Sequence, residues 1–193
     1  MKYILCLLAV LILSGCIDKR KDMTASELEF HSSVSHKTYR TKTPLYLVSD
    51  RSQKDWFIYS PSDSATERAA KKFDGNRIQI SNTGFYIYDI IDSCTYIYIE
   101  KIIHIYSFEY ESDRLYGRVL TGPFSGKLLN VTYLFDLYDG QLTIPRNPKT
   151  EYIEEINSEE SRRMETSVSG TSSQVGTECG TKGKGSEHQA QCK

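Results

Sequence analysis

The stretch from residue 96 to residue 110 constrains the fold of this chain more than any other. It contains almost no helix former and is dominated by tyrosine and isoleucine, which suit the pleated surface of a β-sheet. Both alternating sets of positions are apolar, which predicts a strand that is central in its sheet or covered on both faces. The even-numbered set is Tyr96, Tyr98, Ile102, Tyr106, Phe108 and Tyr110, and the odd-numbered set is Ile97, Ile99, Ile103 and Ile105. The polar pair Glu100-Lys101 in the middle predicts a bend at a β-bulge.

Further strands are predicted on both sides of this run, because short apolar and aromatic segments alternate with turn residues. They cover residues 45–48, 56–59, 78–81, 85–91, 115–120, 128–138 and 141–144. The Asp-Gly pair at 139–140 favours a two-residue hairpin turn between the last two. That turn would place Leu137 opposite Leu142 and Phe135 opposite Ile144 on one apolar face.

One short helix is predicted at about residues 64–74. Ser64 suits its N-cap, Glu67 occupies the third helical position and Gly75 ends it. A capping-box pattern at residues 24–27 indicates a second, weaker helix start. We therefore expect a mainly β fold, built as a single antiparallel sheet, a sandwich or a small barrel with one short helix.

The N-terminus carries an apolar segment at residues 3–13 behind Lys2. At about eleven residues it has the length of a signal-peptide core, whereas a membrane-spanning helix needs roughly 20. Charged residues at 18–22 follow almost at once. A plain secretory signal with an incidental Cys16 and an uncleaved membrane anchor are the alternatives to be weighed.

The tetrapeptide Leu13-Ser14-Gly15-Cys16 closes this segment and resembles the lipobox of bacterial lipoprotein precursors. The resemblance implies that the Cys16 thiol receives a diacylglycerol and that signal peptidase II cuts between Gly15 and Cys16. It covers this N-terminal segment alone and implies no fold. Two or three acyl chains on one cysteine suffice for stable membrane anchoring.

This interpretation divides the chain into four parts. They are a signal peptide at 1–15, the lipidated cysteine with a polar tether at 16–36, an antiparallel β domain at 37–148, and a polar, largely disordered tail at 149–193. Residues 151–163 of the tail are acidic and are expected to be transiently helical at most. The residue after the lipobox is Ile17 rather than Asp, which favours the outer membrane, facing the periplasm, in a Gram-negative host.

Charge composition argues against nucleic acid as a partner. The chain has 24 Lys and Arg against 25 Asp and Glu, for a formal net charge of −1. A nearly neutral body lacks the basic footprint of a nucleic-acid-binding domain. The expected partners are instead the membrane, through the N-terminal lipid, and an envelope protein.

Three cysteines remain once Cys6 leaves with the leader and Cys16 is lipidated. An exported compartment permits disulfides, and Cys179 and Cys192 are a candidate pair closing a short loop. An odd number defines no framework, so reduced or variably paired thiols are the alternative. Cys94 is expected to stay unpaired, either buried or beside a turn.

No pattern in the sequence predicts a catalytic residue, a metal ligand or a cofactor. His31 and His36 have a metal-like separation but no cysteine partners, which favours a polar linker. His104 is expected to be a satisfied histidine on a sheet face. Asp89 and Asp92 are better explained as strand-end and turn residues than as an acid–base pair.

Tyrosines are concentrated in neighbouring predicted strands. If one sheet face is uncovered, they would form a contact surface for a protein, peptide or glycan. Ordinary sheet packing is the favoured alternative, because tyrosine is a normal strand former. The set is Tyr86, Tyr88, Tyr96, Tyr98, Tyr106 and Tyr110.

Three functions therefore remain open. The first is a lipid-anchored envelope protein with a non-catalytic binding or structural role. The second is an inhibitor or immunity-type lipoprotein that neutralises a toxin or lytic enzyme. The third, an envelope hydrolase, is disfavoured because no nucleophile–base arrangement is recognisable in the sequence.

Overall fold

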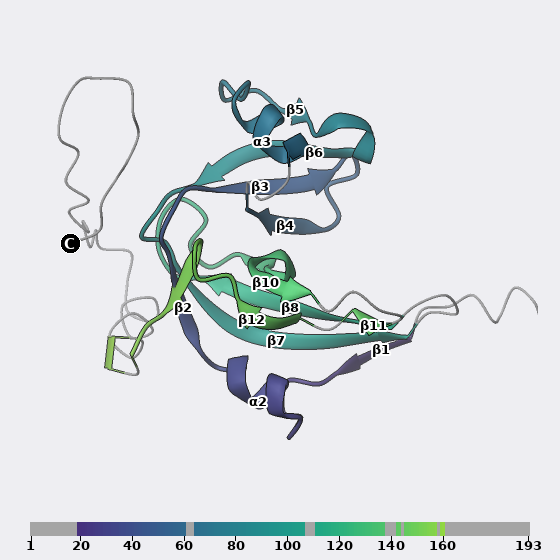
Figure 1. The fold of residues 1–193 in the computed structure, drawn as a ribbon, viewed down its shortest axis with the longest axis vertical. Coiled ribbons are helices and arrows are strands. Elements are labelled where there is room, and N and C mark those ends of the chain that lie inside the picture. Colours follow the sequence, from purple (N-terminus) through teal and green to yellow (C-terminus); the bar gives the residue numbers. More distant parts are fainter. Residues whose placement is uncertain are drawn as a thin grey trace, which may run out of the picture.

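The computed structural model describes residues 19–60, 64–106, 111–137, 142–143, 145–157 and 159–160. Within these residues the fold is mainly β, as predicted, and most strands belong to one large mixed sheet that curls into a half-barrel (Figure 1). The lipobox, Cys179, Cys192 and Tyr110 lie outside the described residues.

Eleven strands of the described part of the chain form this sheet. In spatial order, neighbouring strands of its main path are β13 (Ile153–Glu155), β2 (Thr38–Thr41), β7 (Tyr96–Tyr106), β8 (Glu111–Val119), β9 (Leu128–Asn130), β4 (Trp56–Tyr59), β3 (Leu45–Asp50), β6 (Phe85–Ile91) and β5 (Ile78–Gln79). Along the chain, the 3₁₀ helix η1 (Ser81–Thr83) connects β5 to β6. Two more strands join from the side: β1 (Lys19–Asp22) pairs with β7, and β11 (Leu142–Thr143) pairs with β8.

The expectation of a single antiparallel sheet is wrong in detail, because the sheet is mixed. β4 runs parallel to β9, and β11 runs parallel to β8. The chain crosses the sheet through β6, β7 and β8 before β9 meets β4, so no hairpin fixes their relative direction. The remaining pairings in the sheet are antiparallel.

β7 confirms the strand predicted from its composition, including the irregularity at Glu100. The register between β7 and β8 shifts between Ile99 and Lys101. One extra residue reverses the alternation of side chains, so that Ile99 and Ile102 are both buried in the main core. The bulge therefore moves the core-facing positions of β7 from the odd-numbered to the even-numbered set.

Gly117 allows the closest packing in this core. A Cβ at this position of β8 would lie 2.5 Å from Cγ2 of Ile97 and 3.1 Å from Cγ1 of Val131. The absence of a side chain therefore lets β7 and the segment after β9 meet across β8. The surrounding core residues are almost fully buried.

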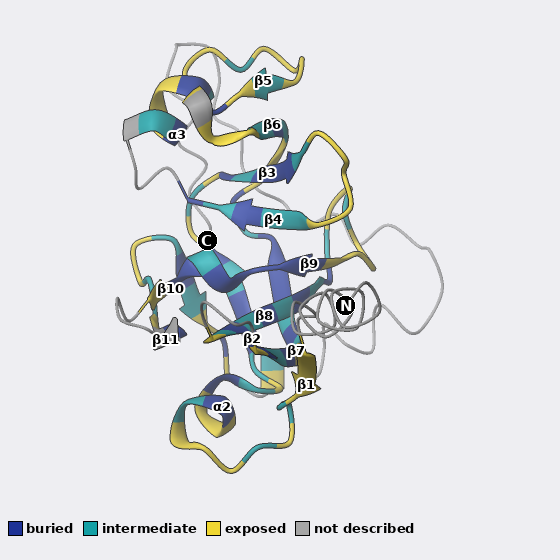
Figure 2. Ribbon diagram, turned by 90° about the vertical axis from the view of Figure 1, so that its right-hand side faces the viewer, coloured by how far each residue is buried: buried dark blue, intermediate teal, exposed yellow. Residues whose placement is uncertain are grey.

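α3 (Ser64–Ala70) coincides with the first part of the helix predicted at about residues 64–74. It lies over the end of the sheet formed by β3, β5 and β6 (Figure 2). Its Ala69 packs in a small cluster with Val48 and Ile87, as expected of an alanine-rich helix with little else to bury. Among the described residues, no helix has the length and apolar content needed to cross a membrane.

α2 (Glu29–Val34) is a second short helix, where the predicted fold counted one. It begins after Leu28 rather than at the capping box of residues 24–27. The Thr24 hydroxyl and N–H instead donate to the carboxylate of Asp22 at 2.6 and 2.9 Å. Thr24 therefore closes a turn after β1 and does not cap the helix.

The strand predicted over residues 128–138 is interrupted after β9. Oδ1 of Asn130 accepts hydrogen bonds from the N–H and the hydroxyl of Thr132 at 3.0 and 2.6 Å. This side-chain-capped turn leads into the 3₁₀ helix η2 (Thr132–Leu134) and then β10 (Phe135–Leu137). Apolar alternation gives no sign of such a turn.

The hairpin register predicted across residues 139–140 is also wrong. β10 pairs with β12 (Pro145–Pro148) in a separate two-stranded sheet, and Leu137 meets the first residue of β12 rather than Leu142. A register irregularity within β10 turns Leu137 outward, where it is 38 % exposed, while Phe135 is fully buried. The two side chains therefore do not share one face.

β13 forms within residues 151–163, where at most a transient helix was expected. It pairs with β2, and Ile153 is buried in the main core. Glu154 accepts hydrogen bonds from Arg40 at 2.6 and 2.8 Å, which neutralises the acidic edge. The described sheet thus extends beyond the predicted domain of 37–148 through β13 at one end and β1 at the other.

Cys94 is disulfide-bonded, which overturns the expectation of an unpaired thiol. It occupies the turn between β6 and β7 with a positive φ of 65°, and its N–H donates to the carbonyl of Thr41 at 2.8 Å. Every other cysteine of the chain lies outside the described residues.

Candidate functional site

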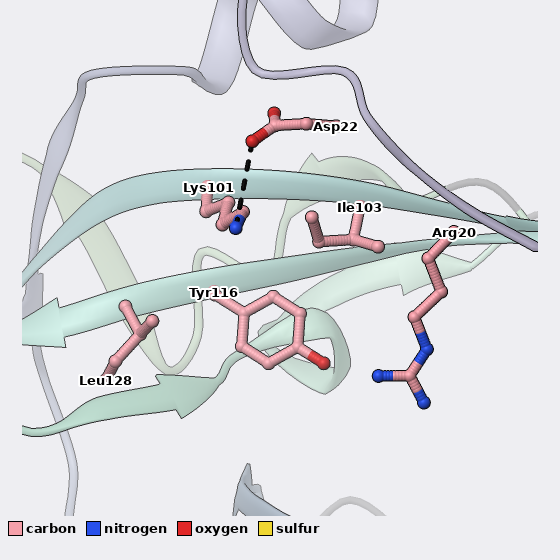
Figure 3. A pocket seen from close by; sticks show the side chains of 6 residues that line it. All are labelled: Arg20, Asp22, Lys101, Ile103, Tyr116 and Leu128. Carbon is pink, nitrogen blue, oxygen red and sulfur yellow. Dashed lines mark ion pairs between the residues drawn. The ribbon is translucent and has the colours of Figure 1, made fainter.

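An open pocket of about 430 Å³ lies on the face of β1, β7, β8 and β9 that is turned away from the main core (Figure 3). The antiparallel register places its lining on one face, because Asp22 lies opposite Ile103 and Lys101 lies opposite Tyr116. The lining residues are Arg20, Asp22, Lys101, Ile103, Tyr116 and Leu128. We call this surface the outer face.

Two cations and one carboxylate line the pocket itself. Lys101 Nζ lies 3.8 Å from Asp22 (Figure 3). The hydrogen bonds from Thr24 hold the pKa of Asp22 below its usual value, and Lys101 lowers this pKa further, so the carboxylate stays ionised. Arg20 is exposed and has no ion pair with another described residue. The pocket therefore carries one uncompensated positive charge.

Two further arginines on the outer face are paired. Arg118 donates to both carboxylate oxygens of Glu100, with a 2.7 Å contact from Nη2, and also donates to the carbonyl of Gly126 at 2.8 Å. Arg114 lies 4.0 Å from the carboxylate of Asp55. These contacts fix both guanidinium groups on the surface without adding net charge.

A second polar cluster lies on the opposite, core-facing side of β7 and β8. Asp113 is 3 % exposed, and it accepts from His31 Nε2 at 2.9 Å and from His104 Nδ1 at 2.6 Å, one at each carboxylate oxygen. His104 lies directly opposite Asp113 in the strand register, whereas His31 comes from α2. We call these three side chains the His–Asp–His row.

The hydrogen-bonding pattern assigns the protons in this row. A carboxylate only accepts, so His31 and His104 must each present an N–H to Asp113. Nδ1 of His31 is buried without a hydrogen-bond partner, and a proton there would be an unsatisfied buried donor. His104 Nε2 lies 3.6 Å from Glu111, and Lys21 of β1 faces it across the ladder.

The His–Asp–His row fastens α2 to the sheet and is separate from the pocket. Both oxygens of Asp113 are occupied, and none of the three side chains lines the pocket. Within the described residues, no group of three or more His, Cys, Asp or Glu side chains is arranged to hold a metal ion. The row therefore has a structural role, which is to hold α2 against the sheet.

Comparison with known proteins assigns no family to this chain. It matches no protein-family model, no curated protein and no solved structure. Its function is therefore argued from its own residues.

The histidines and aspartates weighed from the sequence are not paired with one another. His36 Nδ1 makes a 2.8 Å hydrogen bond with the hydroxyl of Tyr98, whereas His31 is turned toward the buried row. Asp89 and Asp92 are both exposed, one within β6 and the other just beyond it. The spacing of these residues in the sequence therefore does not correspond to a shared site.

The tyrosines considered as a possible contact surface, with ordinary packing as the favoured alternative, lie in separate regions. Tyr86 and Tyr88 sit together on β6, with ring centroids 6.4 Å apart and Arg77 stacked 4.9 Å from the ring of Tyr86. Tyr96 is 4 % exposed, and its hydroxyl donates to Glu160 at 2.8 Å. Tyr86 and Tyr88 on β6 and Tyr96 on β7 therefore belong to strands that are not paired with each other.

The bulge in β7 separates two more tyrosines of that set. Tyr98 lies opposite Arg118 on the outer face, whereas Tyr106 lies opposite Glu111 on the other face. Tyr106 is 39 % exposed. The structure therefore does not gather the described members of the set into one patch.

Sequence reasoning missed both the pocket and the His–Asp–His row. Asp113 occupies the same alternating set as Leu115 and Val119, which are fully buried. That alternation was a usable sign that Asp113 faces the core. Nothing in the spacing links it to His31, because α2 reaches the sheet only through the tertiary fold.

Proposed function

We propose that this chain is a bacterial lipoprotein, anchored by lipid on Cys16, with a non-catalytic binding or structural role in the cell envelope. The observation that carries the proposal is Leu13-Ser14-Gly15-Cys16 behind the apolar segment 3–13. In a Gram-negative host, Ile17 favours placement in the outer membrane, facing the periplasm.

The disulfide at Cys94 supports export. Disulfides persist in oxidising compartments and are rare in the cytosol, where thiols are kept reduced. A protein whose fold includes a disulfide in the β6–β7 turn suits the space outside the inner membrane.

A binding role is supported by the contrast between the two polar clusters. The His–Asp–His row is buried and satisfies its own carboxylate, whereas the pocket is open and presents the unpaired cation Arg20. Open polar surface of this kind favours contact with a partner more than chemistry on a sequestered substrate.

Metabolic labelling with a palmitate analogue in a bacterial host tests the anchor. The wild-type chain should be labelled and found in the membrane fraction, and Cys16→Ser should lose the label because it removes the thiol that receives the lipid. Cys179→Ser, which removes a different thiol, should keep the label. An unlabelled wild type, or persistent labelling of Cys16→Ser, would contradict the proposal.

A further inference from the structure

We propose that the outer face rests on the membrane and that its pocket takes the phosphate of an anionic lipid headgroup. This inference rests on the proposed lipid anchor at Cys16. It goes further by naming the surface of the folded body that faces the bilayer and the chemistry that it recognises.

The tether between Cys16 and the folded body is short. Three peptide units join Cys16 to Lys19 and span at most about 11 Å when fully extended. From Lys19 onward the chain is already folded, since every residue of β1 pairs with β7. A lipid on Cys16 therefore holds β1, and the pocket beside it, within reach of the headgroups.

The strand nearest the proposed anchor is rich in positive charge. β1 begins with Lys19, Arg20 and Lys21 in succession, all exposed. Arg20 points to the outer face, while Lys19 and Lys21 face the other way along the same edge, as their partners in β7 show. Cations held close to an anionic leaflet contribute about 1 kcal/mol each.

The side chains that line the pocket include groups suited to binding a phosphate. A guanidinium donates two parallel hydrogen bonds to a phosphate, and an ammonium acts as a point charge beside it. Arg20 and Lys101 supply these groups, and the Tyr116 side chain adds a phenolic hydroxyl (Figure 3). Leu128, 40 % exposed at the margin, offers apolar contact to the glycerol region of a lipid.

Edge protection is the competing explanation for the β1 cations. Lysine on an edge strand discourages pairing with another chain, and this role needs no ligand. It does not explain why Arg20 is turned away from the edge and into a pocket with Lys101 and Tyr116. The two explanations differ in whether the outer face is covered when the protein is on a membrane.

Amine-reactive labelling of the lipidated protein in vesicles tests the proposal. The purified protein is placed in vesicles of phosphatidylcholine, or of phosphatidylcholine with phosphatidylglycerol, and treated with a membrane-impermeant reagent. Labelling of Lys101 should fall about fivefold with the anionic lipid. This factor corresponds to the contribution of about 1 kcal/mol that one cation makes when it contacts an anionic leaflet. Lys72, exposed just beyond α3, should label equally in both and serves as the internal control.

A matched pair of variants identifies the pocket. Arg20→Gln should abolish the protection of Lys101, whereas Arg68→Gln, the same change on the exposed side of α3, should preserve it. High salt should weaken the protection in the wild type, because these charges are solvent-exposed.

The outcomes separate the two proposals. If the protein carries the palmitate label but Lys101 reacts equally in both vesicles, the outer-face proposal is overturned while the lipid anchor stands. Equal protection by inorganic phosphate, added to phosphatidylcholine vesicles without anionic lipid, overturns the assignment to a lipid headgroup. Absence of the palmitate label overturns the proposed function and, with it, this inference.

Discussion

Nε2 of His31 lies 2.9 Å from Oδ2 of Asp113, although the two residues are 82 positions apart. Both side chains are almost fully buried, and His104 satisfies the second oxygen of the same carboxylate. A six-residue helix is marginal in water on its own. The contact therefore fixes where α2 sits, with Val34 buried beside it.

Removing the carboxylate should destabilise the fold. Asp113→Ala leaves the N–H groups of His31 and His104 without an acceptor, which we expect to lower the free energy of unfolding by about 2–3 kcal/mol. Asp113→Asn should cost less, because the amide oxygen still accepts from His31, while His104, facing the amide nitrogen, can carry its proton on Nε2 beside Glu111. Urea unfolding followed by circular dichroism measures both changes. Asp136→Ala, at an exposed position of β10, is the control and should change the free energy of unfolding by less than about 0.5 kcal/mol. If it destabilises the protein as much as Asp113→Ala does, the hydrogen bonds of Asp113 do not stabilise the fold specifically.

Adding one methyl group at the centre of the core should also be destabilising. Gly117→Ala brings a Cβ to within 2.5 Å of Cγ2 of Ile97, and such overpacking typically costs about 1–3 kcal/mol. Ile97→Ala removes the clashing group at the cost of a cavity. The double variant should therefore be more stable than the sum of the two single losses predicts. Strict additivity in thermal or urea unfolding would show that the close approach is not the cause.

Alkaline conditions should weaken the fold through Tyr39. Burial raises the pKa of this phenol well above its usual value, and the nearby carboxylate of Glu155 raises it further. Because the pKa is higher in the folded state, the stabilisation is complete below the unfolded value of about 10 and is lost as the pH rises above it. The free energy of unfolding should begin to fall as the pH passes about 10 and should keep falling as the pH rises further.

The Tyr39→Phe variant isolates that contribution. It should show a shallower decline over the same alkaline range, because phenylalanine has no proton to lose. Tyr106→Phe, which removes an exposed phenol, should decline like the wild type. If Tyr39→Phe and the wild type lose stability in parallel, the ionisation of Tyr39 is not coupled to unfolding.

Sequence patterns predicted the elements whose side chains repeat regularly. The isoleucines of β7 alternate over most of the strand, and the polar Glu100 marks the bulge that interrupts them. The pattern failed where one side chain redirects the backbone. Asn130 ends β9 through two hydrogen bonds to Thr132, and the flanking apolar residues look the same whether or not this turn forms.

Other features depended on partners distant in sequence. β13 contains few apolar residues and is a strand because β2 offers it an edge and Arg40 neutralises Glu154. The pocket joins residues of four strands, so no local motif marks it. The proposed lipidation stands apart from both, because a lipobox is recognised by enzymes as a short linear sequence and needs no fold.

Under the proposed lipid anchor, the position of β1 would link release from the membrane to self-association. β1 covers the edge of β7 along residues 103–106 and is the first described segment after Cys16. A protease that cut between β1 and α2 would free the body from its anchor, and departure of β1 with the lipid would leave backbone N–H and C=O groups of β7 unpaired. An open edge of this kind is a template for pairing with another chain. Loss of β1 together with the proposed anchor would thus expose an edge that favours self-association, an edge that β1 covers in the intact fold.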